Sequence, residues 1–259
     1  MPGFTRSPPS TLPRGFPTLR IGPHGNPMSE IYFVRHGQAS LGARNYDQLS
    51  PLGWEQARWL GEYFRDRGLE FDRVVIGDMR RHRETLEGIS AGMGLRIEPR
   101  VDSRLNEFSF HPVLRTYCRR HRPEAPEPRT AAAFFGILRE VMSAWIAGDL
   151  DADLAAAACD RPVESWADFN RRVIEGLTEA HRGGRTGERV LIVSSGGPKS
   201  LAIKHVMQLS DTSAVELMMQ IRNTATTRFL GDGERLALHA FNGLAHMERP
   251  DREHAITLV

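Results

Sequence analysis

The sequence is short of lysine, of cysteine and of long hydrophobic runs. Lys199 and Lys204 are the only lysines among its 259 residues, so arginine supplies nearly all of the positive charge. Arginine favours phosphate and carboxylate partners, but a general compositional bias toward arginine explains the same count. The net charge is only +2, which argues against a protein built to bind nucleic acid. Cys118 and Cys159 form neither a metal-ligand spacing nor a disulfide framework, so we expect a reducing, cytoplasmic location.

No apolar run approaches the roughly 20 residues that a membrane-spanning helix needs, so we expect no membrane association. Hydrophobic residues make up 40% of the chain, enough for one substantial core or for a core and a cap.

Residues 1–27 differ in composition from the rest of the chain. They contain several prolines and glycines and no acidic residue. Such a segment buries too little apolar surface to fold, so we predict a disordered, proline-rich extension. Two alternatives stay open: a targeting peptide carrying Arg6, Arg14 and Arg20, or a true start at Met28.

Strand-like and helix-like segments alternate over most of the remaining chain. This alternation predicts an α/β fold with three layers, in which helices cover both faces of a mostly parallel sheet. The predicted strands are 30–34, 73–76, 95–98, 189–194, 225–230 and 236–241. The main predicted helices begin at Ser50-Pro51, Arg80, Ala131, Ser165 and Gly197.

The alternation fails between about residues 105 and 160. This stretch contains a proline cluster, a helical run over 131–146 and an alanine run over 155–158. An insertion between sheet elements usually covers a site or controls access to it. We therefore predict one α/β domain over residues 28–259, with a helical cap inserted at about 105–160.

Four polar motifs follow predicted strands. Loops at the carboxyl edge of a parallel sheet meet in space, so these motifs are expected to form one pocket. They are Arg35-His36-Gly37-Gln38, Arg80-Arg81-His82-Arg83-Glu84-Thr85, Leu105-Asn106-Glu107-Phe108 and Ser194-Ser195-Gly196-Gly197.

The ordered set resembles the histidine phosphatase (phosphoglycerate mutase-like) superfamily over roughly residues 29–248. The set is far more specific than any one of its members. Besides the four motifs, it includes Asn45–Gly53, Glu164–Phe169 and Asn223-Thr224-Ala225.

The resemblance implies a role for each site residue. His36 would attack phosphorus and carry the phosphoryl group, and Arg35 and Arg81 would bind the phosphate oxygens. Glu107 would protonate the leaving oxygen and then help to deprotonate water. The resemblance implies no metal and no cofactor. Simpler interpretations remain for three of these residues. His36 could be a buried structural histidine, Arg81 part of a solvated basic helix start, and Glu107 a surface carboxylate.

The chain departs from the family pattern Ser-His-Gly-Gly at Ser195, where the second histidine would normally bind the phosphoryl oxygens. Serine donates one hydrogen bond but carries no charge. Together with Gly196 and Gln38, Ser195 remains a candidate phosphate-binding residue, because the following helix presents backbone amides to an anion. The best candidate for a compensating histidine is His111, four residues beyond Glu107.

The resemblance implies a metal-independent phosphoric monoester hydrolase acting through a phosphohistidine at His36, with activity reduced by Ser195. A catalytically weak or inactive relative that binds a phosphorylated ligand or partner is the alternative, and a phosphoglycerate mutase is a weaker one. We expect a small phosphate ester as ligand, no nucleic acid and no membrane; the oligomeric state is open, a homodimer being one option.

Overall fold

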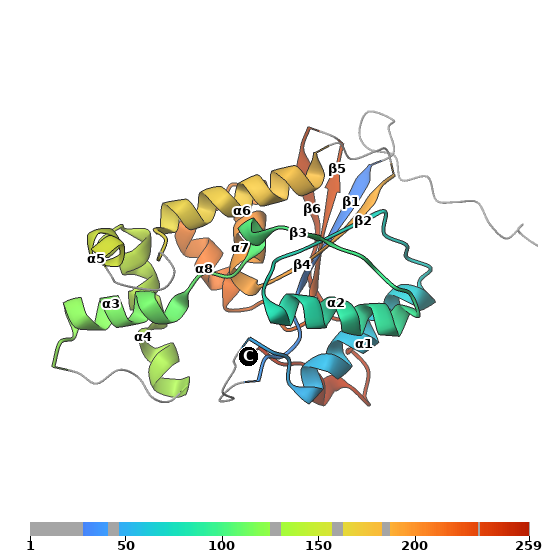
Figure 1. Ribbon diagram of the computed structural model, residues 1–259, viewed down its shortest axis with the longest axis horizontal. Coiled ribbons are helices and arrows are strands. Elements are labelled where there is room, and N and C mark those ends of the chain that lie inside the picture. Colours follow the sequence, from blue (N-terminus) through green and yellow to red (C-terminus); the bar gives the residue numbers. More distant parts are fainter. Residues whose placement is uncertain are drawn as a thin grey trace, which may run out of the picture.

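The computed structural model describes residues 28–40, 47–124, 131–156, 163–182, 187–232 and 234–258. Within those ranges, six strands form one mixed sheet in the order β3-β2-β4-β1-β5-β6 (Figure 1). The strands are β1 (Ser29–Arg35), β2 (Arg73–Ile76), β3 (Arg100–Val101), β4 (Arg189–Ser194), β5 (Thr226–Gly231) and β6 (Leu236–Gly243). The α/β fold predicted from the sequence is confirmed.

The parallel register of the central strands brings the ends of β1, β2 and β4 together. Arg35 of β1 lies opposite Ser194 of β4, so the residues that follow, His36 and Ser195, leave the sheet side by side. Ile76 of β2 lies opposite Val193 of β4. Three strands therefore deliver their next residues to one edge, where α/β sheets hold ligands.

The sheet departs from the parallel pattern on one side, and one strand lies elsewhere than predicted. β5 pairs antiparallel with β1, and β6 pairs antiparallel with β5. The prediction of a strand over 95–98 is wrong: Leu95 is exposed, and the third strand consists of Arg100 and Val101, which pair with β2. Leu95 and Ile97 mimic a strand by alternation, but Ile97 packs at the margin of a core cluster instead.

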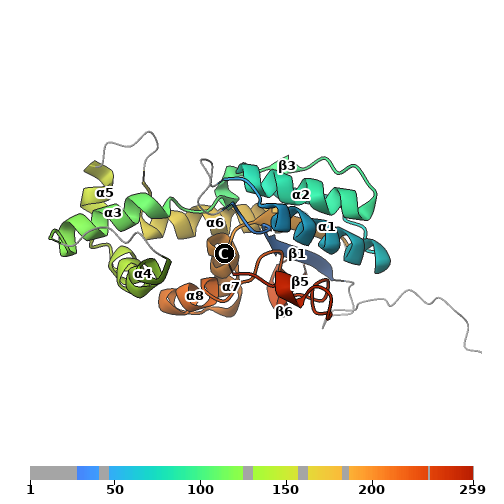
Figure 2. The same ribbon diagram turned by 90° about the horizontal axis from the view of Figure 1, so that it is seen from below.

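Helices cover both faces of the sheet (Figure 2). On one face lie α1 (Pro51–Asp66) and α2 (Arg80–Met93), whose apolar stripes pack on Tyr32 and Val34 of β1. On the other face lie α6 (Trp166–His181) and α7 (Gly196–Met207), which pack on Ile31 and Phe33. Adjacent β1 side chains thus point into opposite cores, as the two-residue period of a strand requires.

The sequence signals at the start of α1 act as predicted. Ser50 accepts a hydrogen bond from the Gly53 amide at 3.0 Å, and Pro51 occupies the first helical position. The serine provides an acceptor for a backbone amide that has no partner inside the helix, and the proline has no amide hydrogen to satisfy.

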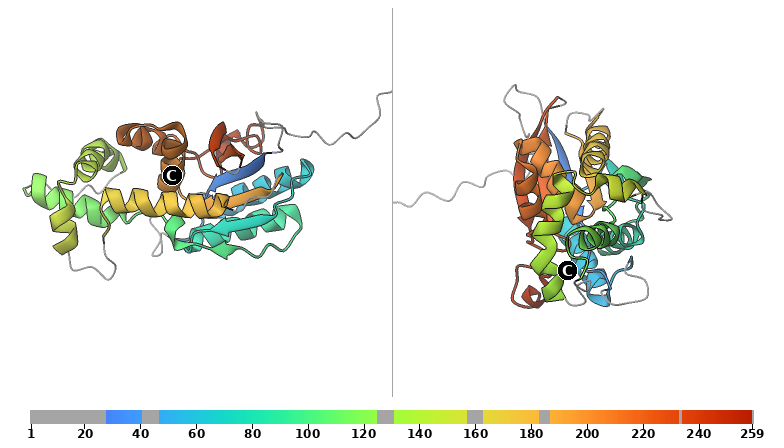
Figure 3. Two further views of the ribbon diagram at one scale, coloured as in Figure 1. Left: turned by 90° about the horizontal axis from the view of Figure 1, so that it is seen from above. Right: turned by 90° about the vertical axis from the view of Figure 1, so that its left-hand side faces the viewer.

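A second group of helices lies beyond the sheet and forms a core of its own (Figure 1). We call α3 (Phe110–His121), α4 (Ala131–Ile146) and α5 (Asp151–Ala156) the cap. The cap packs on α8 (Asp211–Met218) and on the first half of α6 through Phe169 and Val173. Figure 3 shows α6, in gold, running from the cap to the sheet.

The structure also bears on the expectations about membranes and about the amino-terminal segment. None of the helices in the described ranges is long and apolar enough to cross a membrane. The predicted extension over residues 1–27 lies outside the described residues, as does the end of the alanine run from residue 157.

Candidate active site

His36 lies directly after β1 and is only 4% exposed. Its amide donates to the Ser194 carbonyl at 2.8 Å, and its carbonyl accepts from the Asn223 side chain at 3.2 Å. Its ring Nδ1 lies 2.7 Å from the carbonyl oxygen of Gly37. A carbonyl oxygen only accepts, so Nδ1 carries the proton, and the neutral ring presents its lone pair at Nε2.

The electrostatic surroundings keep His36 in this neutral form. Burial lowers the pKa of its imidazole well below the usual value, and the charges of Arg81 and Arg35 lower it further. The Gly37 carbonyl acts in the opposite direction but is the smallest influence. At neutral pH the ring is therefore an uncharged base with a free Nε2, the form required of a nucleophile.

Glycine at position 37 lets the backbone beside His36 lie against the backbone of Gly53 in α1. A Cβ atom there would lie 2.4 Å from the Gly53 carbonyl oxygen, which is backbone and cannot move aside cheaply. The Gly37 amide donates to Thr85 Oγ1 at 3.0 Å, and Thr85 in turn donates to the Arg81 carbonyl at 2.7 Å. The end of β1 is thereby tied to the first turns of α2.

Arg81 is 5% exposed and enters the site from α2. Its Nη1 atom donates to Asp47 Oδ1 at 2.9 Å, and Nη2 lies 3.5 Å from Ser195 Oγ. Asp47 also accepts from the Arg80 amide at 2.9 Å. Since Met79, the residue before α2, provides no side-chain cap, Asp47 caps the helix from a different loop while it holds Arg81.

Arg35 is partly buried at the end of β1 and is anchored by the carboxyl-terminal segment. Its Nη1 donates to the carbonyl oxygens of Ile221 at 2.5 Å and Leu258 at 2.7 Å. A Cβ atom added at Gly196 would lie 3.7 Å from Arg35 Nε, so the guanidinium borders the start of α7. Residues far apart in the chain thus fix its position beside His36.

Glu107 reaches the same place from the loop after a short 3-10 helix, Ser103–Leu105. Its Oε2 accepts from the Gly197 amide at 3.0 Å. Burial raises the pKa of this carboxyl, while the Gly197 amide and Arg81 act against the rise. A side chain at Gly197 would place its Cβ 2.1 Å from Glu107 Oε1, so glycine leaves the room that the carboxyl occupies.

Arg172 of α6 supports the loop that carries Glu107. Its Nη1 donates to the carbonyl oxygens of Arg104 at 2.8 Å and Asn106 at 2.7 Å. The same guanidinium lies 4.8 Å above the ring of Phe169 and pairs with Glu164. The position of the acid therefore depends on a helix that also belongs to the cap core.

Ser195 precedes α7 and is fully buried, but its hydroxyl does not cap that helix. Its Oγ lies 2.8 Å from Nε2 of His82, which is also fully buried. The predicted compensating residue, His111, is instead exposed at the start of α3, where its ring faces Phe110. The histidine that contacts Ser195 is His82, because the first turn of α2 points this side chain inward.

The structure brings His36, Arg35, Arg81, Glu107 and Ser195 together at one edge of the sheet. Gly196 lies in the first turn of α7, where amides have no partner within the helix. Gln38 has a structural contact as well, since its Oε1 accepts from Ser50 at 2.8 Å.

Sequence reasoning gave no role to His82, Thr85 or Asp47. His82 and Thr85 lie within the motif Arg80–Thr85, in which the family pattern marks only Arg81. A signal for His82 was present: Ser195 stands where the family pattern has a histidine, and another histidine lies next to a predicted phosphate-binding arginine. Nothing local marks Asp47 as the cap of a helix that begins 33 residues later.

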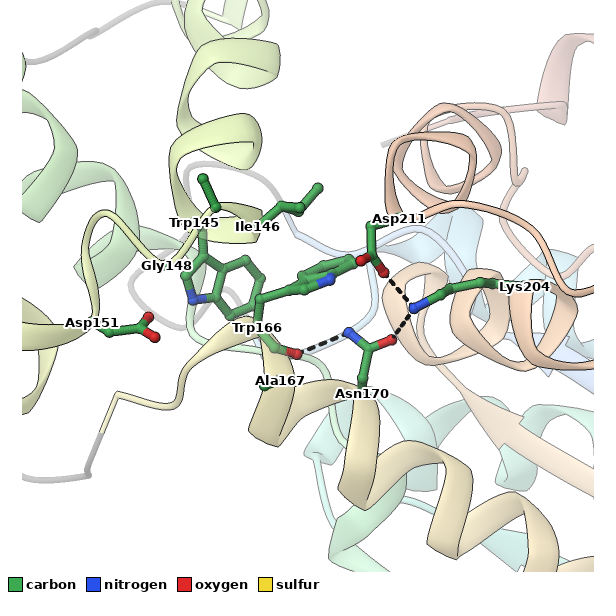
Figure 4. A pocket seen from close by; sticks show the side chains of 10 residues that line it. Trp145, Ile146, Gly148, Asp151, Trp166, Ala167, Asn170, Lys204 and Asp211 are labelled. Carbon is green, nitrogen blue, oxygen red and sulfur yellow. Dashed lines mark hydrogen bonds and ion pairs between the residues drawn. The ribbon is translucent and has the colours of Figure 1, made fainter.

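A cavity of about 460 Å³ lies elsewhere, between the cap and α7. Trp145 and Trp166 line it together with Lys204, which pairs with Asn170 and Asp211 (Figure 4). Its lysine is thus already bound within the protein, and the site around His36 is separate from it. Among the described residues, no three histidine, cysteine, aspartate or glutamate side chains gather as a set of metal ligands.

Comparison with known proteins shows the family of this chain. The family described as the histidine phosphatase superfamily (branch 1) matches residues 31–243. A broad-specificity phosphatase of Saccharomyces cerevisiae is 38% identical over 66 residues, which cover 23% of this chain and only 29% of the yeast protein.

Solved structures share the fold at low sequence identity. A phosphoserine phosphatase from Entamoeba histolytica has a TM-score of 0.58 at 17% identity, over 85% of this chain and 99% of that one. A phosphoglycerate mutase from Bacillus anthracis has a TM-score of 0.59 at 16% identity, over 85% of this chain and 96% of that one. The match over most of the chain places it in a family: the protein belongs to the histidine phosphatase superfamily, branch 1.

Proposed function

We propose that this protein hydrolyses phosphoric monoesters through a phosphohistidine at His36. The observation that carries the proposal is the hydrogen bond from His36 Nδ1 to the Gly37 carbonyl, because it leaves the lone pair at Nε2 inside an arginine-lined site. Arg35 and Arg81 supply positive charge where a phosphate would lie. Glu107 supplies a carboxyl group whose raised pKa favours the protonated form.

The chemistry proceeds in two steps. In the first, the Nε2 lone pair of His36 attacks phosphorus, the ester P–O bond breaks, and Glu107 gives its proton to the leaving oxygen. In the second, the Glu107 carboxylate takes a proton from water, and the hydroxide oxygen attacks phosphorus while the bond from phosphorus to His36 Nε2 breaks. Inorganic phosphate leaves, and both side chains return to their starting forms.

The cap is proposed to select the substrate. Phe108, the residue after Glu107, is part of the cap core, so cap residues border the leaving-group side of the site. Family membership and a match to part of a broad-specificity phosphatase support a small phosphate ester as substrate.

The test compares the purified protein with its His36→Ala variant on an aryl phosphate. We expect hydrolysis by the wild-type protein alone, together with an acid-labile, alkali-stable phosphoprotein when the reaction is quenched early. Equal background rates for the two proteins would refute a role for His36.

A second candidate function is phosphate-ester binding without turnover, and Ser195 is the observation that favours it. This candidate predicts calorimetric binding of a phosphate ester with no release of inorganic phosphate. Hydrolysis of a bound ester would exclude it. A mutase is a third, weaker candidate and would transfer the phosphoryl group to a second hydroxyl instead of water.

A further inference from the structure

Two buried histidines face each other in the site, and the proposed mechanism uses only one of them. The rings of His36 and His82 lie 6.0 Å apart between centroids, with 34° between their planes. His82 is fully buried beside Arg81. A buried polar ring beside a cationic group lowers stability unless it has a partner, so the surroundings of His82 need an explanation.

The partner of His82 is the Ser195 hydroxyl, at 2.8 Å from Nε2. A serine immediately before a helix usually bonds a backbone amide of the first turn, as Ser50 and Ser165 do in this protein. Ser195 makes no such bond and contacts His82 instead. A buried histidine and a serine that does not cap its helix are thus each other's hydrogen-bond partner.

We propose that His82 and Ser195 form one phosphate-binding unit, in which the Ser195 hydroxyl contacts the phosphoryl oxygens and His82 positions it. This inference rests on the proposed attack by His36. When His82 Nε2 donates to Ser195 Oγ, the hydroxyl proton is free to bond a phosphoryl oxygen. When Nε2 accepts instead, the Ser195 hydroxyl donates its proton to His82 and has none left for the phosphoryl group. The proton on His82 therefore decides whether Ser195 can donate to the substrate.

The surroundings of His82 allow it to respond to a bound anion. Burial and Arg81 lower its pKa well below the usual value, whereas the Gly77 backbone raises it. A phosphate dianion held by Arg81 adds negative charge nearby and favours the imidazolium form, in which Nε2 donates to Ser195 Oγ. The unit then delivers both a donated hydrogen bond and a nearby positive charge.

The geometry predicts the outcome of restoring a histidine at position 195. With Oγ only 2.8 Å from His82 Nε2, an imidazole at position 195 would overlap the ring of His82. Ser195→His alone is therefore expected to lower activity. Ser195→His combined with His82→Ala removes the overlap and places one ring in the same space.

The test measures aryl phosphate hydrolysis by His82→Ala, Ser195→His and the double variant. By analogy with the loss of one transition-state hydrogen-bond donor, we expect His82→Ala to lower kcat by about 100-fold. The double variant should exceed His82→Ala by about tenfold or more, a coupling typical of side chains that share one site. His82→Gln, which keeps a donor near the place of Nε2, should be less impaired than His82→Ala.

Two controls separate the possible failures. His181→Ala removes a partly buried ring at the opposite end of β1, next to Gly231, and should leave the rate unchanged. His36→Ala tests the proposed function by itself. If His36→Ala is inactive while His82→Ala keeps the wild-type rate, the His82–Ser195 unit is refuted and the function stands. A double variant no more active than the product of the single effects also refutes the unit, even if His82→Ala is poorly folded.

Discussion

The cap core and the site at the edge of the sheet are both buried, but they are built from opposite chemistries. The cap core stacks aromatic rings: Trp145 is fully buried, with its ring 4.7 Å from Phe108 and 5.8 Å from Phe169 between centroids. Its indole Nε1 donates to the Glu164 carbonyl at 3.1 Å. Such a core is largely apolar and gains stability from every ring that it buries.

The site buries groups that would be more stable in water. Lys199 has no exposed surface, and burial together with Arg35 lowers the pKa of its amine. Its Nζ donates to the Ala225 carbonyl at 2.6 Å. His36, His82 and Glu107 all have shifted pKa values for the same first reason, burial. Burying such groups costs folding free energy, which the apolar packing of the cores offsets.

The largest effect on stability is expected for Trp145→Ala in the cap core. Removing a buried tryptophan side chain should lower the free energy of unfolding by about 3–5 kcal/mol. Urea denaturation measures the loss. Trp54→Ala is the matched control, because Trp54 is 36% exposed on α1, and it should change stability far less. Similar losses in both variants would contradict the assigned role of the cap core.

In the site, by contrast, Glu107→Gln should increase the stability of the protein while it lowers activity. The variant should lose roughly 100- to 10,000-fold in kcat, the usual contribution of a general acid–base group. It should also be more stable than the wild-type protein at pH 7. Because the folded-state pKa of Glu107 is raised, ionisation penalises the folded state as pH rises above the unfolded-state pKa of 4.5.

Thermal denaturation at several pH values checks the sign for Glu107→Gln. The stability advantage should be absent near pH 4, where Glu107 is protonated in both states, and should grow toward neutral pH. An advantage that does not change with pH would show that the carboxyl is not the cause.

The smallest expected effect is that of Asp47→Asn, which removes a charge from the border of the site. Asp47 is 35% exposed in its side chain and competes with a bound anion for Arg81. An amide keeps the acceptor for the α2 amides but not the charge. Inorganic phosphate should therefore bind up to about fivefold more tightly, within the range of a partly exposed ion pair. Isothermal titration calorimetry measures this, and weaker binding would contradict the competition.

The sequence predicted the site better than it predicted the contacts inside it. Runs of buried β-branched residues mark β2 and β4, and the parallel arrangement then places His36 and Ser195 side by side. The third strand was misplaced because alternation at Leu95 and Ile97 imitates a half-buried strand. The His82–Ser195 contact depends on how α2 is rotated against the sheet, and a residue pattern fixes that rotation only to within a face.

Position 47 illustrates a different limit. Asp47 acts as a helix cap and as an arginine partner across a long separation in the chain, whereas capping signals in a sequence are read from adjacent residues. Long-range polar contacts of this kind become visible only when the loops are placed.

The helix α6 contributes to both the cap core and the core against the sheet, and this has a mechanical consequence. The first half of this helix is part of the cap core, the second half packs on the sheet, and Arg172 between them holds the loop of Glu107. A cap mounted in this way does not swing independently of the sheet. Force applied to the cap by a bulky ligand would therefore reach Glu107, the proposed proton donor, before it reached His36, the proposed nucleophile. Under the proposed mechanism, changes in cap shape that alter substrate size would also alter the distance over which Glu107 transfers its proton.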